Sequence, residues 1–349
     1  MVRIEPGVCM DYESLGHHGP RVSRLALGTM GMSDMYGPAD RAESIATIHA
    51  ALEQGITLLD TGDFYGMGHN ELLVGEALQS TRRDRVLISV KFGALRGPRP
   101  AEFNGYDSRP AAVRNFVAYS LKRLGVDYID IYRPARLDPN VPIEETIGAI
   151  AELIRQGYVR YVGLSEVGAA TLRRAQAVHP IADLQIEYSL ISRGIEREIL
   201  PACSELGIGL TAYGVLSRGL ISGHWTKQRN PSDLRSRAPR FQAENLDANL
   251  ALVEKLRVIA RQMGASVAQL AIAWVLARAS DQQACIIPLV GARRRDQLSE
   301  ASEALNLRLS RAQLADIERA VPPGSAAGAR YPEAQLAHMD SERSSSAHA

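Results

Sequence analysis

Residues 57–71 read TLLDTGDFYGMGHNE, and this stretch decides the fold prediction. Its apolar first part is typical of a buried strand, which ends at Asp60 and leads into a glycine-rich turn that carries Tyr65. A second predicted strand, at 86–90, ends in the same way at Lys91. If the two strands are parallel neighbours, the three polar side chains meet at one edge of a sheet, and we expect a functional site there.

An aspartate, a tyrosine and a lysine at one edge can deliver a proton to a carbonyl oxygen. A free phenol has a pKa of about 10 and is a poor acid at neutral pH, but a nearby ammonium stabilises the phenolate and lowers that pKa. In this interpretation Asp60 keeps Lys91 charged and oriented. The alternative from this stretch alone is structural: Asp60 caps the next helix, Tyr65 packs in a loop and Lys91 is a solvated cation.

The alternation of strand and helix continues along the chain, and several of the predicted helices end at a glycine. Such alternation implies right-handed β-α-β crossovers and a parallel sheet. The pattern predicts strands at 25–28, 57–60, 86–91, 128–132, 159–163, 183–188, 209–212 and 285–288. It predicts helices at 40–54, 70–78, 110–124, 143–156, 169–178, 195–206, 248–263 and 266–278.

About eight parallel strands predict an α/β fold of the closed (β/α)8 barrel type, with the active site at the C-terminal ends of the strands. An open doubly wound sheet is the alternative, but it needs a G-x-G-x-x-G motif after its first strand. Neither residues 25–31 nor residues 66–71 supply that motif. We therefore expect a single barrel domain over 1–321, with an N-terminal hairpin at 8–27 and extra helices near its C-terminus.

Two segments outside the repeat are expected near the barrel mouth. Residues 217–246 have few large apolar side chains, two prolines and many arginines, which predicts a flap. Residues 322–349 form a tail rich in Ala, Gly and Ser, and we expect its end to be disordered. We expect this tail to lie partly over the mouth, and its most specific part is the patch Arg330-Tyr331-Pro332-Glu333.

Composition restricts the partners more than the fold. Of the 349 residues, 46% are hydrophobic and 23% are charged, and the formal net charge is +1, which argues against nucleic acid as a partner. Three scattered cysteines, Cys9, Cys203 and Cys285, suit buried thiols in a reducing compartment better than a disulfide framework or a zinc site. The sequence predicts neither a signal peptide nor a membrane span, so we expect a cytoplasmic protein without a metal site. The oligomeric state stays open.

The motif DTxxxYGxGxNE at residues 60–71, followed by Lys91 at a strand end, resembles the aldo-keto reductases. These are NADPH-dependent oxidoreductases built on a (β/α)8 barrel. The resemblance extends from residues 22–29 to residues 287–293. It implies that Asp60, Tyr65 and Lys91 belong to a catalytic tetrad and that the cofactor is NADPH or NADP+.

The resemblance also implies a nicotinamide site. Ser165 and Gln185 correspond to residues that hold the nicotinamide carboxamide, and Tyr213 corresponds to the aromatic side chain that stacks on its ring. Glu166 stands where the family has asparagine. The remaining cofactor residues implied are Gly28 and Thr29 after the first strand, Leu216, Ser217, Arg218 and Gly219 in the pyrophosphate loop, Gly291, Arg293 and Gln297 at the 2′-phosphate, and Glu300 at the adenine.

The main departure from the family concerns the fourth member of the tetrad. The family has a histidine after the fourth strand, but residues 132–138 read YRPARLD, with Ala135 in its place. That histidine positions the substrate carbonyl, so we expect either a bulkier substrate or a replacement donor from a loop or from the tail near Tyr331 and His338.

These observations predict a carbonyl reductase that acts on a small-molecule aldehyde or ketone, with Tyr65 as the general acid. Reduction and the reverse alcohol oxidation are both allowed. The alternative function is that of a nicotinamide-binding regulatory subunit with little turnover, similar to the barrel subunits attached to some potassium channels.

Overall fold

The computed structural model describes residues 10–33, 35–98, 102–225, 233–281 and 284–343. Eight parallel strands close into a barrel, with each strand paired to the next barrel strand along the chain and the last paired to the first. The predicted (β/α)8 fold is confirmed. The barrel strands are β3 (Ala26–Gly28), β4 (Leu58–Gly62), β5 (Leu87–Phe92), β8 (Ile129–Pro134), β9 (Val159–Ser165), β10 (Ile181–Glu187), β11 (Gly209–Tyr213) and β12 (Ile286–Gly291).

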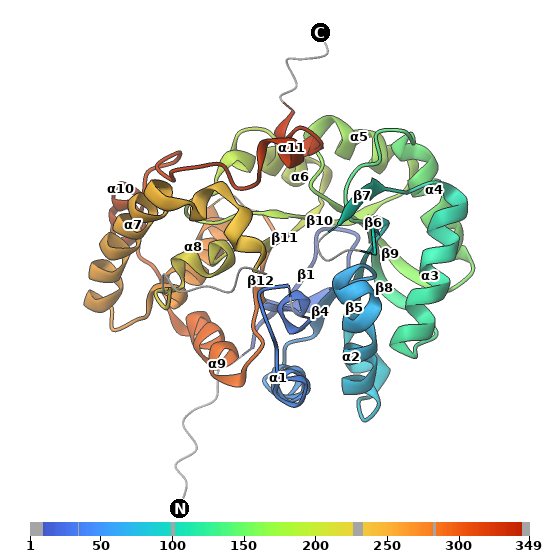
Figure 1. Ribbon diagram of the computed structural model, residues 1–349, viewed down its shortest axis with the longest axis horizontal. Helices are drawn as coiled ribbons and strands as arrows, with labels where there is room; N and C mark the ends of the chain where they lie inside the picture. The colour runs from blue at the N-terminus through green and yellow to red at the C-terminus, as the bar shows by residue number, and fades with distance from the viewer. Residues whose placement is uncertain (1–9, 34, 99–101, 226–232, 282–283, 344–349) are drawn as a thin grey trace, which may run out of the picture.

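Helices surround the barrel (Figure 1). Those that follow successive strands are α1 (Arg41–Glu53), α2 (His69–Leu78), α3 (Pro110–Leu124), α4 (Ile143–Arg155), α5 (Ala169–Val178), α6 (Ile199–Leu206), α8 (Val267–Asp281) and α9 (Arg295–Glu303). The additional helices are α7 (Ala243–Gln262), α10 (Arg311–Ala320), which packs on α7, and α11 (Glu333–Leu336) in the tail.

The helix boundaries follow from local signals in the sequence. Asp40 caps α1 by accepting a hydrogen bond from the backbone N–H of Glu43. Pro110 begins α3, and Gly125 ends it in the left-handed conformation, with φ of 65°. These signals predicted the bounds of α1 to α6 and of α8 to within four residues. The additional helix α7 begins at Ala243, earlier than predicted, and no helix was predicted at α9.

An antiparallel hairpin of β1 (Tyr12–Ser14) and β2 (Arg21–Ser23) precedes the barrel. Of the hairpin expected at 8–27, residues 8 and 9 lie outside the described part. In the described residues the register pairs Glu13 with Val22, so the pairing is confined to Tyr12–Ser14 and Arg21–Ser23. Leu15 in the turn is fully buried, and the N–H of His17 donates to the carbonyl of Gly207 at 2.7 Å. The hairpin thus covers the end of the barrel opposite the strand C-termini.

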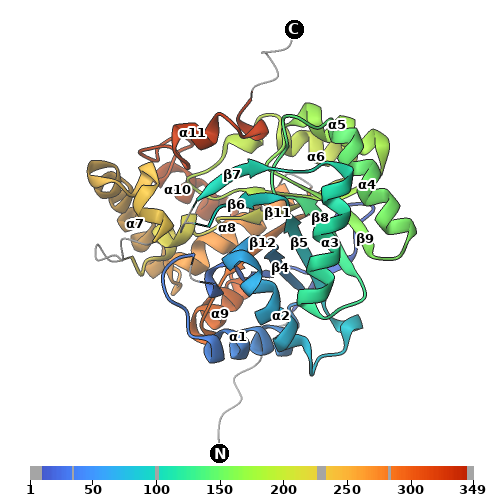
Figure 2. The same cartoon turned by 45° about the vertical axis from the view of Figure 1, so that its right-hand side comes forward.

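A second hairpin was not predicted. Strands β6 (Ala94–Arg96) and β7 (Phe103–Tyr106) pair between β5 and α3. In both overall views this hairpin lies on the same side of the barrel as α11 (Figures 1 and 2). The segment is short and carries no clear alternation of apolar and polar residues, so periodicity gave no signal for it.

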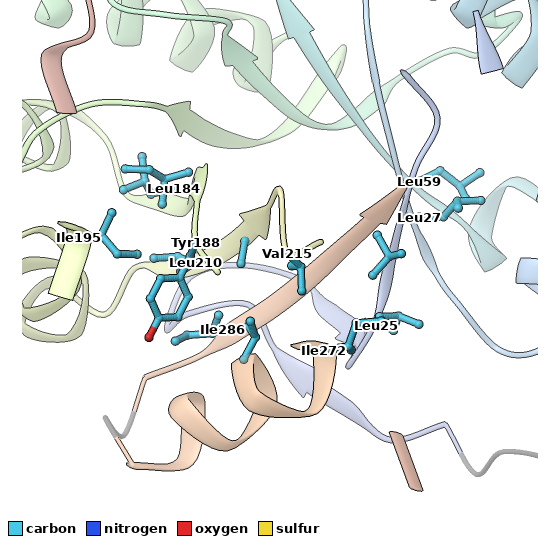
Figure 3. Close-up of a cluster of buried hydrophobic side chains, with 14 of the residues drawn as sticks. Leu25, Leu27, Leu59, Leu184, Tyr188, Ile195, Leu210, Val215, Ile272 and Ile286 are labelled. Carbon is cyan, nitrogen blue, oxygen red and sulfur yellow. The ribbon is translucent and has the colours of Figure 1, made fainter. Parts of the chain in front are cut away.

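The apolar core fills the space between the barrel and its helices. Figure 3 shows part of it, with Leu210 and Ile286 from neighbouring barrel strands facing Ile272 of α8. Aromatic rings extend this layer, since Phe92 and Tyr132 stack with centroids 4.3 Å apart. Such packing fixes the strand ends and therefore the positions of the side chains that they carry.

The barrel interior is partly polar beneath its mouth. Arg133 and Asp183 form a fully buried ion pair at 3.1 Å, and the Thr211 hydroxyl donates to the same carboxylate. Gly163 makes room for this pair, because a Cβ at that position would lie 2.6 Å from an Asp183 carboxylate oxygen.

The segment predicted as a flap is structured in the part that is described. Residues 217–246 contain the 3-10 turns η5 (Ser217–Ser222), η6 (Leu234–Arg237) and η7 (Pro239–Phe241), and residues 226–232 lie outside the description. In the described residues no single helix is long and apolar enough to cross a membrane; α7 and α8 reach the required length and composition only as a pair bent by 85°.

Candidate active site

Asp60 and Lys91 form the centre of the site. Their strands β4 and β5 are parallel neighbours whose register sets Asp60 beside Ser89 and Gly62 beside Lys91. The Lys91 ammonium pairs with the Asp60 carboxylate, and both side chains are buried. The other carboxylate oxygen accepts hydrogen bonds from Ser89 at 3.0 Å and from Gln185 at 2.8 Å. Asp60 is therefore a buried partner of Lys91 rather than a helix cap, and Lys91 is not a solvated cation.

Tyr65 lies beside this pair. It begins η2 (Tyr65–Gly68), in which Gly66, Met67 and Gly68 all take the left-handed conformation, with φ of 56°, 55° and 94°. That conformation explains the two glycines of the motif. Tyr65 is 6% exposed, and the Lys91 nitrogen lies 5.1 Å from the centre of its ring. The three residues predicted to act together are brought together.

The electrostatics correct one detail of the prediction. Burial raises the pKa of Tyr65 well above 10, and the negative charge of Asp60 adds to this rise, so the expected lowering by Lys91 is wrong for this structure. Burial also lowers the pKa of Lys91 to about 8, although Asp60 opposes the change. The phenol thus holds its proton firmly next to a lysine that is mostly charged at neutral pH.

Asn70 fixes the loops around the pair, a role that was not predicted. Its amide nitrogen donates to the carbonyl of Thr29 at 2.9 Å and to Ser33 at 2.8 Å, while its oxygen accepts from Thr61 at 2.7 Å. The Thr29 hydroxyl lies 2.8 Å from the carbonyl oxygen of Asp60. Thr29, expected to contact the cofactor, therefore joins the ends of β3 and β4. Asn70 belongs to the motif at 60–71, but the motif alone did not reveal its partners.

Ala135 directly follows β8 at the mouth of the barrel, in the position where the family has the tetrad histidine. Ala135 is buried, and its N–H donates to the carbonyl of Phe92 at 2.8 Å. The next residue, Arg136, reaches Ser165 at 3.4 Å and the Tyr331 hydroxyl at 3.5 Å. The Tyr331 hydroxyl in turn lies 2.9 Å from that of Tyr213. Through Tyr331 the tail contacts Arg136 and Tyr213, and it brings a phenol close to the position that lacks the imidazole.

Glu166 and Arg330 anchor the tail. The Arg330 guanidinium donates to Glu166 at 2.5 and 3.0 Å, and the Ser341 hydroxyl donates to the same carboxylate at 2.6 Å. The Tyr213 hydroxyl adds a hydrogen bond at 2.7 Å. Burial alone would raise the pKa of Glu166, but Arg330 outweighs it and lowers that pKa to about 2. The glutamate in place of the family asparagine is thus a docking point for the tail.

The expected cofactor residues lie at neighbouring strand ends. Gly28 of β3 pairs with Gly291 of β12, and β12 is flanked on its other side by β11, which ends at Tyr213. Some of these side chains contact protein groups. The Arg293 guanidinium donates to the carbonyls of residues 36–38, and the side chain of Gln297 accepts from the N–H of Arg293. Glu300 pairs with His224. Gln185 holds Asp60, whereas a contact with a nicotinamide carboxamide was expected of it.

The loop after β11 has a backbone conformation that suits an anion. Ser217, Arg218 and Gly219 are consecutive left-handed residues, with φ of 45°, 57° and 90°. Backbone N–H groups in such turns point into a concavity that binds anions. The Arg218 side chain adds a positive charge and lies 4.2 Å from the centre of the Tyr331 ring. Backbone and side chain together suit a diphosphate, and Leu216 begins this loop.

This chain belongs to the aldo/keto reductase family, whose model matches residues 24–322. It is therefore an oxidoreductase of a family that typically binds nicotinamide cofactors. A probable aldo-keto reductase from Glycine max is 43% identical over 320 residues, which cover 91% of this chain and 90% of that protein.

Two solved structures resemble the chain along most of its length. A glycerol dehydrogenase from Gluconobacter oxydans is 32% identical, with a TM-score of 0.79, and the match covers 90% of this chain and 96% of that one. A thermostable aldo-keto reductase, solved with the inhibitor epalrestat, is 28% identical, with a TM-score of 0.70, and the match covers 89% of this chain and all of that one.

Proposed function

We propose that the protein reduces a small aldehyde or ketone with NADPH, and that Tyr65 is the general acid. The observation that carries this proposal is the buried Asp60–Lys91 pair with Tyr65 beside it, at the C-terminal ends of the barrel strands. The family membership supports the same class of reaction.

Each of the three residues has a separate task in the proposal. Bound NADPH supplies the hydride for the carbonyl carbon. Tyr65 donates its proton to the carbonyl oxygen, and its high pKa keeps the phenol protonated until that moment. The Lys91 ammonium compensates the negative charge that the phenolate then carries, and Asp60 holds Lys91 in place through a buried ion pair.

The cofactor would lie across the ends of β9 to β12 and β3. Arg218 and the left-handed backbone after Leu216 suit its diphosphate. Tyr213 and Ser165 would face the nicotinamide, and Arg293 the 2′-phosphate. Glu166 is committed to the tail and does not contribute an amide to the nicotinamide site.

We also propose a reducing, cytoplasmic environment. Cys203 is buried and Cys285 is half-buried, and Cys9 lies outside the described residues. Burial raises the pKa of both described thiols to about 12, which keeps them protonated and unreactive.

The test is the substitution Tyr65→Phe, which removes the acidic hydroxyl and keeps the ring. We expect the rate of NADPH consumption, measured with a panel of aldehydes, to fall by at least roughly a hundredfold. This is the typical effect of losing a general acid. The dissociation constant of NADPH should stay unchanged. Tyr158→Phe is the matched control, because that tyrosine is 46% exposed and precedes β9, at the opposite end of the barrel.

Two results would contradict the proposal. Turnover near that of the wild type in Tyr65→Phe would remove this residue from the mechanism. Tight NADPH binding by the wild type, without consumption on any aldehyde, would favour the alternative of a regulatory nicotinamide-binding subunit.

A further inference from the structure

Arg136 carries a buried donor that the described structure leaves without a partner. Its Nη1 donates to the carbonyl of Ala135 at 2.6 Å and reaches Ser165 at 3.4 Å. Its Nε is buried and has no hydrogen-bond partner among the described residues, and its Nη2 makes a long contact of 3.5 Å with the Tyr331 hydroxyl. A buried donor without a partner is costly and calls for an explanation.

The unused donor belongs to the edge of the guanidinium that binds carboxylates. Nε–H and the adjacent Nη2–H point in parallel and can hold both oxygens of one carboxylate. The same edge is used on the surface of this protein, where Arg174 donates to Glu144 from Nε at 2.8 Å and from Nη2 at 2.7 Å. At Arg136 this edge is almost free.

The ion pairs at the mouth also leave Arg136 without a carboxylate partner. Lys91 pairs with Asp60, Arg330 with Glu166, and Arg240 with Glu187. Arg136 and Arg218 lie at the same mouth, and neither forms an ion pair with the residues that the structure describes.

For each of these two arginines, the absence of a directly bound protein carboxylate has a structural explanation. Arg218 lies on the loop that suits a diphosphate. The charge of Glu166 acts on Arg136 only from a distance and helps to raise its pKa. Its oxygens already accept hydrogen bonds from Arg330, Ser341 and Tyr213, so it makes no direct contact with the free edge of Arg136. Since buried cations need a counterion, Arg136 is left for an anion that comes with a ligand.

Arg136 is also next to the groups that handle the proton. Strand β8 pairs with β5, so that Arg133 lies beside Lys91 and Pro134 beside Phe92, and Arg136 follows two residues later. Burial raises the pKa of Tyr65, and the positive charge of Arg136 opposes that rise, as expected for groups that share one pocket. A ligand that reaches both Arg136 and Tyr65 needs its anionic group close to its carbonyl.

We propose that the Nε and Nη2 edge of Arg136 binds a carboxylate adjacent to the reacting carbonyl, so that the preferred substrates are 2-oxo acids. This inference rests on the proposed reductase function and assigns its substrate class. Arg136 takes over the orientation of the substrate at the place where Ala135 leaves out the imidazole. In a 2-oxo acid the carboxylate is attached directly to the ketone carbon, which matches the neighbouring positions of Arg136 and Tyr65.

The test measures ligand binding without turnover. Oxamate is an unreactive analogue of a 2-oxo acid, and oxamide is its neutral counterpart. Titration calorimetry of the full chain, with and without NADP+, should show at least about tenfold tighter binding of oxamate than of oxamide. Arg136→Met should abolish that difference, while Arg136→Lys, which keeps the charge but loses the parallel donors, should retain part of it.

The controls separate charge, fold and catalysis. Arg114→Met removes an exposed arginine that pairs with Glu152 and should leave oxamate binding unchanged. Thermal melting shows whether each variant folds. Equal affinities of oxamate and oxamide in the wild type would overturn the proposal without any variant, and so would unchanged oxamate binding in a folded Arg136→Met.

Tyr65→Phe distinguishes this inference from the function on which it rests. The substitution should abolish reduction but keep oxamate binding, because the carboxylate is held by Arg136. Oxamate binding without reduction in the wild type would contradict the reductase function and retain the anion site. Reduction of neutral aldehydes without selective oxamate binding would contradict the anion site and retain the reductase function.

Discussion

Two buried ion pairs lie at the same rim of the barrel and differ in how the chain brings them together. Asp60 and Lys91 are 31 residues apart and come from adjacent strands, whose register places them side by side. Glu166 and Arg330 are 164 residues apart, and join a strand end to the tail. The first pair is therefore part of the barrel itself, whereas the second exists only when the tail is docked.

The two pairs also differ in what they position. The first lies beside Tyr65, the proposed proton donor, with the Lys91 nitrogen 5.1 Å from the centre of its ring. The second holds the segment that brings Tyr331 to within 2.9 Å of Tyr213. We infer that the first pair serves the chemistry and that the second shapes the pocket, so breaking them should produce different losses.

The largest effect is expected from Lys91→Met. Removing one partner of a buried ion pair leaves the other charge uncompensated, which typically costs about 3–5 kcal/mol of unfolding free energy. Carbonyl reduction should also be lost, because the phenolate of Tyr65 has no cation beside it. Denaturant unfolding and NADPH consumption measure the two losses separately.

The double variant Asp60→Asn, Lys91→Met sharpens this result. It removes both charges, so it should recover much of the stability but none of the activity. If reduction returned together with stability, the pair would be structural and not catalytic.

A smaller effect is expected from Arg330→Met, because the tail can lift and let water reach Glu166. The fall in the pKa of Glu166 from 4.5 to about 2 corresponds to about 3–4 kcal/mol at most. This contribution is present above the unfolded-state pKa and is lost as pH falls through the folded-state value. The melting temperatures of wild type and variant should therefore differ near neutral pH and converge between about pH 4.5 and pH 2.

Arg330→Met should also affect substrate binding and cofactor binding differently. NADPH affinity should stay close to that of the wild type, while the KM for the carbonyl substrate rises because Tyr331 is no longer held. Truncation before Arg330 should reproduce this pattern. A melting difference that persists unchanged at low pH would mean that Arg330 stabilises the tail by packing and not by its charge.

The contrast between the pairs also explains what the sequence could predict. Asp60, Tyr65 and Lys91 follow from strand ends and one motif, because parallel register fixes which residues are neighbours. The partner of Glu166 could not be found in this way, although the patch at 330–333 was recognised as specific. Its position depends on how the tail folds back, and no periodic pattern encodes that path.

The raised pKa of Tyr65 and the role of Asn70 were missed for a related reason. Both depend on burial and on several partners that meet in three dimensions: the Tyr65 ring is enclosed, and Asn70 bonds to Thr29, Ser33 and Thr61. The sequence identifies such residues as parts of a motif, but the contacts that give them their properties come from three different segments.

The smallest effect is expected from a rim cation that belongs to neither pair. The Arg293 guanidinium donates to the backbone carbonyls of Tyr36, Gly37 and Pro38 at 3.2–3.4 Å. If it also binds the 2′-phosphate of NADPH, Arg293→Ala should weaken NADPH by the roughly 1.5–3 kcal/mol of a charge-assisted hydrogen bond. NADH has no such phosphate, so its affinity should change little.

Fluorescence titration with both cofactors measures the difference. Arg294→Ala is the control, since that exposed neighbour pairs with Asp296. Equal losses for the two cofactors would show that Arg293 supports the loop at 36–38 and does not select NADPH.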